Sequence, residues 1–121
     1  MTLRACFVIS MLLAVFATAT PVAASNLSFM NDTPYTHFTK DDHKIFNDAL
    51  QDTLNKGAIG ESRNWSNPAS KAGGKLKVLK SFERGQTTCR TMSIANKAKG
   101  RSASGQYNFC EQASGEWKLA E

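Results

Sequence analysis

Apolar side chains recur every three or four residues between positions 39 and 57, which is the spacing of one face of an α-helix. They are Ile45, Phe46, Ala49, Leu50 and Leu54. Thr39 precedes the stripe as a candidate N-cap, with Asp42 placed to complete a capping box, and Gly57 follows as a stop signal. The pattern predicts a helix from Thr39 to Gly57. Its apolar face is expected in the core rather than on a partner, because a small domain needs that area itself.

Beyond Gly57 the pattern changes to an alternation of apolar and polar residues, which is typical of half-buried strands. The alternating or β-rich segments are residues 59–65, 75–83, 87–95, 104–111 and 116–119. Leu76, Val78 and Phe82 are expected on one face of the sheet, and the basic segment Asn96–Ser102 is interpreted as a loop. Short strands separated by turns predict an antiparallel β-meander of about four to five strands. The helix is expected to cover one sheet face, which gives an α+β fold.

The start of the chain has the three regions of a secretory signal peptide. Arg4 supplies the positive charge, an apolar run extends from Phe7 to Ala19, and Val22 and Ala24 offer small residues for cleavage. The alternative is a transmembrane anchor, but the apolar run is shorter than the roughly 20 residues that span a bilayer. We therefore expect residues 1–24 to be removed and the mature chain to have no transmembrane segment.

Residues 25–38 form a polar segment with a turn signal at Asn31–Pro34. It is interpreted as an extended lead-in, with a disordered linker as an equal alternative. Apolar residues in it, such as Tyr35, are able to dock on the domain. The structured domain is expected to comprise residues 39–121.

Loss of Cys6 with the signal peptide leaves an even pair, Cys89 and Cys110. Such a pair in an exported protein predicts a disulfide. A redox pair usually has the Cys-x-x-Cys spacing, which is absent, and a zinc site needs two further ligands at suitable spacing. We expect a structural disulfide between neighbouring strands, and neither a metal site nor a cofactor.

The charge balance is modestly basic. The chain has 15 Lys and Arg against 10 Asp and Glu, and removal of Arg4 leaves 14 basic residues and a net charge of +4. This balance suits weak attraction to anionic polymers or lipid surfaces. Export argues against nucleic acid as a partner.

Several short motifs occur in a particular order along the mature chain. They are Thr39-Lys40-Asp41-Asp42, Trp65-Ser66-Asn67-Pro68, Cys89-Arg90, and Cys110 followed by Ser114-Gly115-Glu116-Trp117. Together they resemble the bacterial 17 kDa surface-antigen family, a surface-protein domain found in Rickettsia, Legionella and many other proteobacteria. The resemblance implies a Gram-negative envelope protein, periplasmic or associated with the outer membrane, and supplies no catalytic residues. The lipobox cysteine and glycine zipper that usually precede this domain are absent, so no lipid anchor is expected.

Basic residues concentrate in the second predicted strand and in the predicted loop after the third. The candidates for binding an anionic partner are Lys75, Lys77, Lys80, Arg84, Lys97, Lys99 and Arg101, with Lys71 just upstream. The expected partner is lipopolysaccharide, phospholipid or peptidoglycan. The competing interpretation is a solvated sheet face whose lysines discourage edge pairing.

Trp65 and Trp117 are the largest side chains of the mature chain, and two roles are open to them. Exposed together, they would form an aromatic surface for stacking on sugar rings. Packing in the core of a small sheet is the more usual role for such residues.

No catalytic constellation is apparent. His37 and His43 flank the helix start, but the neighbouring aspartates are explained by capping, and neither a nucleophile elbow nor a phosphate-binding glycine loop occurs. The leading hypothesis is a non-enzymatic envelope protein, structural or binding an anionic component through a basic sheet face. The alternatives are an inhibitor or accessory domain that docks on an exported protein and, more weakly, a periplasmic hydrolase.

Overall fold

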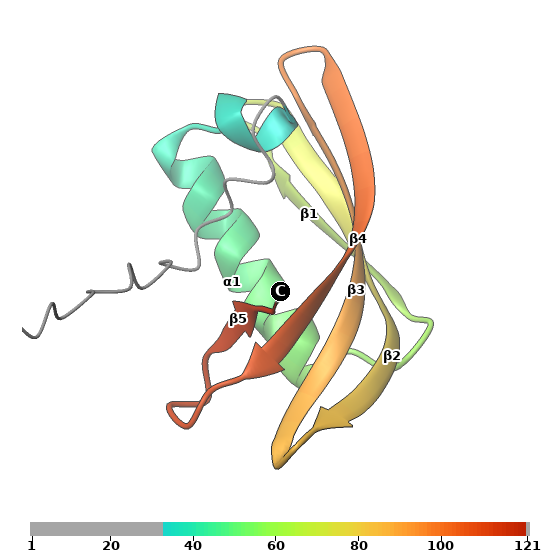
Figure 1. Ribbon diagram of the computed structural model, residues 1–121. Helices are drawn as coiled ribbons and strands as arrows, with labels where there is room; N and C mark the ends of the chain where they lie inside the picture. Colours follow the sequence, from blue (N-terminus) through green and yellow to red (C-terminus); the bar gives the residue numbers. More distant parts are fainter. Residues whose placement is uncertain (1–32, 121) are drawn as a thin grey trace, which may run out of the picture.

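The computed structural model describes residues 33–120, and the expected signal peptide at residues 1–24 lies outside them. The elements are η2 (Pro34–His37), α1 (Lys40–Lys56), β1 (Ser62–Asn67), β2 (Ala72–Arg84), β3 (Thr87–Ala98), β4 (Arg101–Glu111) and β5 (Trp117–Leu119). All strand pairs are antiparallel, and the spatial order β1-β2-β3-β4-β5 equals the chain order. The helix α1 lies against one face of this meander (Figure 1). The predicted α+β fold is confirmed.

The helix begins where its capping residues predicted. Thr39 and Asp42 form a capping box, in which the Asp42 N–H donates to Thr39 Oγ1 (3.1 Å) and the Thr39 N–H donates to Asp42 Oδ2 (2.8 Å). At the other end Gly57 is the C-cap, and Arg90 Nη1 donates to the carbonyl oxygens of Leu54 and Gly57, each at 2.9 Å. Otherwise unpaired carbonyls at the helix end thus gain a charged donor from β3.

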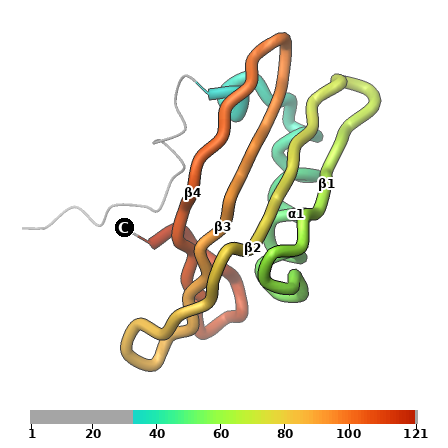
Figure 2. The backbone as a smooth tube through the Cα atoms, turned by 90° about the vertical axis from the view of Figure 1, so that its right-hand side faces the viewer, coloured from blue at the N-terminus to red at the C-terminus, as the bar shows by residue number. Residues whose placement is uncertain are grey.

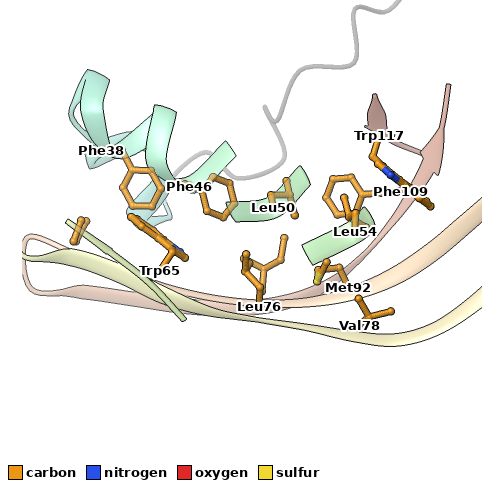
Figure 3. Packing of buried hydrophobic residues seen from close by; sticks show 13 residues of the cluster. Phe38, Phe46, Leu50, Leu54, Trp65, Leu76, Val78, Met92, Phe109 and Trp117 are labelled. Atoms are coloured by element: carbon orange, nitrogen blue, oxygen red, sulfur yellow. The ribbon is translucent and has the colours of Figure 1, made fainter. Parts of the chain in front are cut away.

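The core is a single layer between α1 and the sheet, with the buried side chains pointing toward one another in Figure 3. The helix contributes Phe46, Leu50 and Leu54, all nearly inaccessible to water. The strands contribute Trp65, Ala72, Leu76, Val78, Met92, Ile94, Ala98, Phe109 and Trp117. This burial of the helical stripe matches its expected role as core.

The predicted loop at Asn96–Ser102 is wrong. Strand β3 continues to Ala98 and β4 begins at Arg101, so Lys99 and Gly100 alone form the turn. Both turn residues have positive φ, 50° and 74°, as a two-residue hairpin turn of the primed type requires. The polar residues before the turn made the sequence look like a loop. Asn96 can nevertheless lie buried in the strand, because it accepts a hydrogen bond from Trp65 Nε1 (3.0 Å).

The other strand limits also differ from the prediction. Strand β1 begins at Ser62 rather than at Ile59, which is exposed in the preceding turn. Strand β2 begins at Ala72, so Gly73 and Gly74 belong to the strand rather than to the connection before it. Small residues carry no alternation signal, so the pattern could not locate this part of β2.

A β-bulge interrupts the pairing of β2 with β3. Val78 is paired with Met92, but the next pair is Lys80 with Thr91, so Leu79 is the extra residue. Beyond this point the alternation of β2 is reversed, because side chains alternate with a period of two. Leu76 and Val78 therefore face α1 whereas Phe82 faces away from it. The prediction that these three share a face is wrong for Phe82.

The described part of the lead-in is not extended. Pro34–His37 form the short 3-10 helix η2, and Pro34 and Phe38 are buried. The Tyr35 ring packs against Phe38 and Phe46, with ring centroids 5.5 and 5.8 Å apart. Packing against the core therefore begins before residue 39.

The predicted disulfide is present between Cys89 and Cys110, which lie directly opposite each other on β3 and β4. The bridge closes a chain separation of 21 residues that contains the whole β3–β4 hairpin. A loop of this length corresponds to about 3 kcal/mol of stabilisation in the chain-entropy account. That contribution is a large part of the stability of a small domain.

Replacing both cysteines, Cys89→Ala with Cys110→Ala, is expected to lower the free energy of unfolding by about 3 kcal/mol, because the unfolded chain regains its loop entropy. Urea denaturation of the oxidised protein and of the variant measures the difference. In the unreduced protein, an alkylating reagent should label neither cysteine. Labelling of both, or equal stability of the two proteins, would contradict the structural role.

Candidate functional site

One face of the sheet is covered by α1, and the opposite face, here called the open face, has no layer of described residues over it. Figure 2 looks onto the open face, with α1 behind the strands. Strand register and alternation place a set of basic side chains on the open face. They are Lys75, Lys77, Lys80 and Arg84 from β2, Lys97 from β3 and Lys118 from β5.

The bulge at Leu79 is what assembles the β2 part of this set. With regular alternation, Lys80 and Lys77 would lie on opposite faces, but the extra residue brings Lys80 onto the open face. Phe82 lies on the same face, with Lys80 Nζ 5.6 Å and Arg84 Cζ 5.8 Å from its ring centroid. These are cation–π distances, so the aromatic ring supports a pair of cations on one strand.

No acidic side chain of the five strands alternates onto the open face. Glu83 and Glu111, the acidic residues of the strands, alternate toward the side of α1. The ion pairs lie within α1, between α1 and β1, or beside β1. Lys75, Lys77 and Lys97 have no ion-pair partner among residues 33–120. Among the strand residues, negative charge thus lies on the helix side, and the charged side chains of the open face are all basic.

The candidates predicted from the sequence include every open-face cation of the strands except Lys118. Of the predicted candidates, Lys99 lies in the β3–β4 turn, and Arg101 alternates toward the other side of the sheet. Lys118 was missed because β5 is so short. The available signal was its neighbour, since a buried Trp117 requires Lys118 to point outward.

A groove of about 790 Å³ hollows the open face at the end near the β1–β2 and β3–β4 turns. Its floor includes Gly73, Gly74 and Ala95, and Lys71, Lys75 and Lys97 also line it. Gly73 is the glycine that alternates onto the open face, and a Cβ there would come within 2.9 Å of the Trp65 carbonyl oxygen, whereas Gly74 faces Trp65 and Asn96 on the helix side. The groove therefore exists where small residues replace larger side chains on the sheet surface.

The tryptophans are core residues, so the surface-stacking interpretation is wrong. Trp65 and Trp117 are each 5 % exposed. The Trp65 indole N–H donates to Asn96, and the Trp117 indole N–H donates to Asn55 Oδ1 at 2.8 Å. Gln51 also bonds the Trp117 backbone through both its amide atoms, at 2.9 and 3.0 Å. Trp117 thus joins β5 to α1.

Asp42 is the one strongly buried carboxylate in the described chain, being 1 % exposed. Besides the capping bond, it accepts hydrogen bonds from Asn67 Nδ2 (2.7 Å) and Ser70 Oγ (2.5 Å). Burial raises the pKa of Asp42, but the bonds from Ser70, Thr39 and Asn67 outweigh burial and hold this pKa below its ordinary value. A carboxylate kept ionised by three donors connects the helix start to the β1–β2 turn, and is not available as a general acid.

His43 also has a packing role. Its ring lies edge-on to Tyr35 and Phe38, with centroids 4.5 and 5.4 Å away. No Ser, Cys or carboxylate is hydrogen-bonded to either His43 or His37 in the part of the chain that the structure describes. The geometry therefore offers neither histidine an activated nucleophile or an orienting acid.

Over residues 33–120 the structure contains no cluster of three or more His, Cys, Asp or Glu side chains arranged to hold a metal ion. Neither described helix is long and apolar enough to cross a membrane. Comparisons with family models, with curated proteins and with solved structures find no match to this chain.

The Asp42 network predicts a pH-dependent stability. Asp42→Asn removes the charge that three side-chain and backbone donors share, and should lower the free energy of unfolding by about 2–3 kcal/mol near neutral pH. Because the pKa of Asp42 is lower in the folded state, its contribution is complete above its ordinary pKa and is lost as pH falls through the folded value. The difference between wild type and variant should therefore narrow below about pH 4.

Urea denaturation at neutral and acidic pH measures this difference. Asp41→Asn is the matched control, since Asp41 is its exposed neighbour in the same helical turn. The control should lower the free energy of unfolding by less than about 1 kcal/mol, which is the range of a helix-dipole interaction. A difference for Asp42→Asn that stays constant or grows on acidification would show that the carboxylate is not the ionised centre of the network.

Proposed function

We propose that this chain is a non-enzymatic, exported cell-envelope protein of the 17 kDa surface-antigen type, which binds an anionic envelope component through the open face. The observation that carries the proposal is the separation of charge between the two sides of the sheet. The open face presents Lys75, Lys77, Lys80, Arg84, Lys97 and Lys118, and the two acidic residues of the strands, Glu83 and Glu111, alternate to the other side of the sheet.

The energetics favour a polyvalent anionic partner. Each Lys or Arg near an anionic surface contributes about 1 kcal/mol, so no single contact suffices but a face of several cations does. The lysines without a protein partner do not have to break an ion pair before they bind. Such binding is screened over a Debye length of about 8 Å at physiological ionic strength, so salt must weaken it.

What favours binding over catalysis is the composition of the open face itself. Its strand residues are basic residues, serine, threonine, asparagine, glutamine and small residues, with Phe82 and the Cys89–Cys110 disulfide, and they include no histidine or carboxylate. General acid–base chemistry needs a group that gains and loses a proton near neutral pH. A fixed set of positive charges instead suits the holding of an anion.

The surface-antigen assignment rests on the residues that carry the resemblance. Thr39 and Asp42 cap the helix, and Asp42 accepts a hydrogen bond from Asn67. Arg90 caps the helix end, and Trp117 joins β5 to α1. These motif residues make contacts that hold the helix and the strands together. Proteins that share a fold are expected to share such contacts. The proposed location is the periplasm or the periplasmic side of the outer membrane.

The test is sedimentation of the mature, oxidised protein with isolated outer membrane, peptidoglycan or lipopolysaccharide. Pelleting with one of these at about 50 mM salt and its loss at about 500 mM salt is expected. Lys75→Glu with Lys77→Glu should lower the apparent affinity about tenfold or more, because two attractive contacts become repulsive.

Lys40→Glu with Lys44→Glu is the matched control, because it changes the net charge equally but on α1. It should leave the affinity within about threefold. Equal losses in both double variants would mean that net charge alone drives binding. Salt-resistant pelleting, or none with any fraction, would contradict the proposal and favour a protein partner.

A further inference from the structure

We infer that the groove on the open face is a binding subsite for a phosphate-bearing saccharide. The inference rests on the proposed function and names the chemistry that the positive face recognises at one place. The groove is lined by three lysines from three segments: Lys71 from the β1–β2 turn, Lys75 from β2 and Lys97 from β3. None of them has an ion-pair partner within residues 33–120.

The strand register explains both the hollow and the placing of charge. Two neighbouring cross-strand rows make the groove on the open face. The first runs Ser66, Gly73, Lys97, Ser102 and the second runs Asn64, Lys75, Ala95, Ser104. The small residues Gly73 and Ala95 occupy one diagonal and the lysines Lys75 and Lys97 the other.

This diagonal arrangement suits a single anionic group. Diagonal neighbours on adjacent strands are roughly 7–8 Å apart, so the flexible side chains of Lys75 and Lys97 can converge over the small residues. An ammonium group is a compact point charge with rotatable donors, which matches a phosphate with its several oxygens better than it matches a planar carboxylate.

The remaining side chains of the two rows are neutral and polar. They are Ser66 and Asn64 on β1 and Ser102 and Ser104 on β4, all exposed. Hydroxyl and amide groups both donate and accept hydrogen bonds, as the hydroxyls of a sugar require. The next row, Ser62, Lys77, Ser93 and Gln106, has no glycine or alanine, so the hollow ends there.

The lining argues against two other phosphate carriers. Insertion into a lipid surface uses exposed apolar or aromatic side chains, and the one large exposed hydrophobic residue of the described chain, Ile59, is not in the groove. Single-stranded nucleic acid is held by stacking on aromatic rings. The only aromatic residue in the lining is Trp65, which is buried.

The test is a titration of the ¹⁵N-labelled mature protein with glucose 1-phosphate, followed by amide chemical shifts. Shifts should concentrate at Gly73, Gly74, Ala95 and Lys97. Inorganic phosphate should bind at least about fivefold more weakly, and glucose alone should give no shift, because neither supplies both charge and hydroxyls. Vesicles of phosphatidylglycerol test the lipid alternative.

Ala95→Ile is the decisive variant, since it fills the groove floor without altering charge and suits a strand. It should lower the affinity for glucose 1-phosphate about tenfold or more, and Lys75→Gln with Lys97→Gln should do the same. Lys80→Gln with Lys118→Gln removes two cations of the open face outside the groove, and should leave this affinity within about twofold. Unchanged amide spectra away from the groove verify the fold of each variant.

Three outcomes would overturn the inference: shifts spread evenly over the open face, equal affinity for phosphate and glucose 1-phosphate, or binding by the vesicles alone. Full binding of glucose 1-phosphate by Ala95→Ile would also overturn it. If Ala95→Ile still pellets with an envelope fraction while Lys75→Glu with Lys77→Glu does not, the groove is not the subsite but the proposed function stands. If both variants still pelleted with the envelope fraction, the groove subsite and the proposed function would both be contradicted.

Discussion

The packing of one apolar helix stripe against one face of the sheet is the contact on which the rest of the structure depends. Phe46, Leu50 and Leu54 are nearly inaccessible to water, and the strand residues opposite them complete a single core layer. Within residues 33–120 no second α-helix covers the other face. That face must therefore carry polar and charged side chains, as antiparallel sheets with one solvated face do. A solvated face follows from the packing, but a face with cations alone does not.

The local irregularities of the sheet give the solvated face its character. The bulge at Leu79 moves Lys80 to the same side as Lys77, and Gly73, near the start of β2, lowers the sheet surface beside Lys97. Both features cost regular pairing or side-chain packing, which bulges and strand glycines usually do. They occur in β2, the strand that also supplies most of the basic residues. Shape and charge are thus combined on one strand.

The elements with a strong local signal were predictable from the sequence, and those determined by tertiary contacts were not. The helix was found because Thr39, Asp42 and Gly57 mark its ends, and the disulfide because two cysteines remain in an exported chain. Asn96 was assigned to a loop because polar residues between apolar segments usually lie in loops. In the structure it is buried in a strand, where it accepts a hydrogen bond from Trp65. A one-residue bulge leaves no mark in a period-two pattern, so the side on which Phe82 lies could not be foreseen. The groove could not be predicted from the sequence either, because it depends on which residues the strand register brings side by side.

The central claim is that the open face, and not the helix side, is the working surface. It is tested most directly by acetylating the lysines of the mature protein with and without isolated outer membrane and reading each site by mass spectrometry. The account predicts slower modification of Lys71, Lys75, Lys77 and Lys97 in the presence of the membrane fraction, and unchanged rates at Lys40, Lys44 and Lys56 of α1. Protection of the helix lysines, equal protection everywhere, or protection nowhere would contradict it.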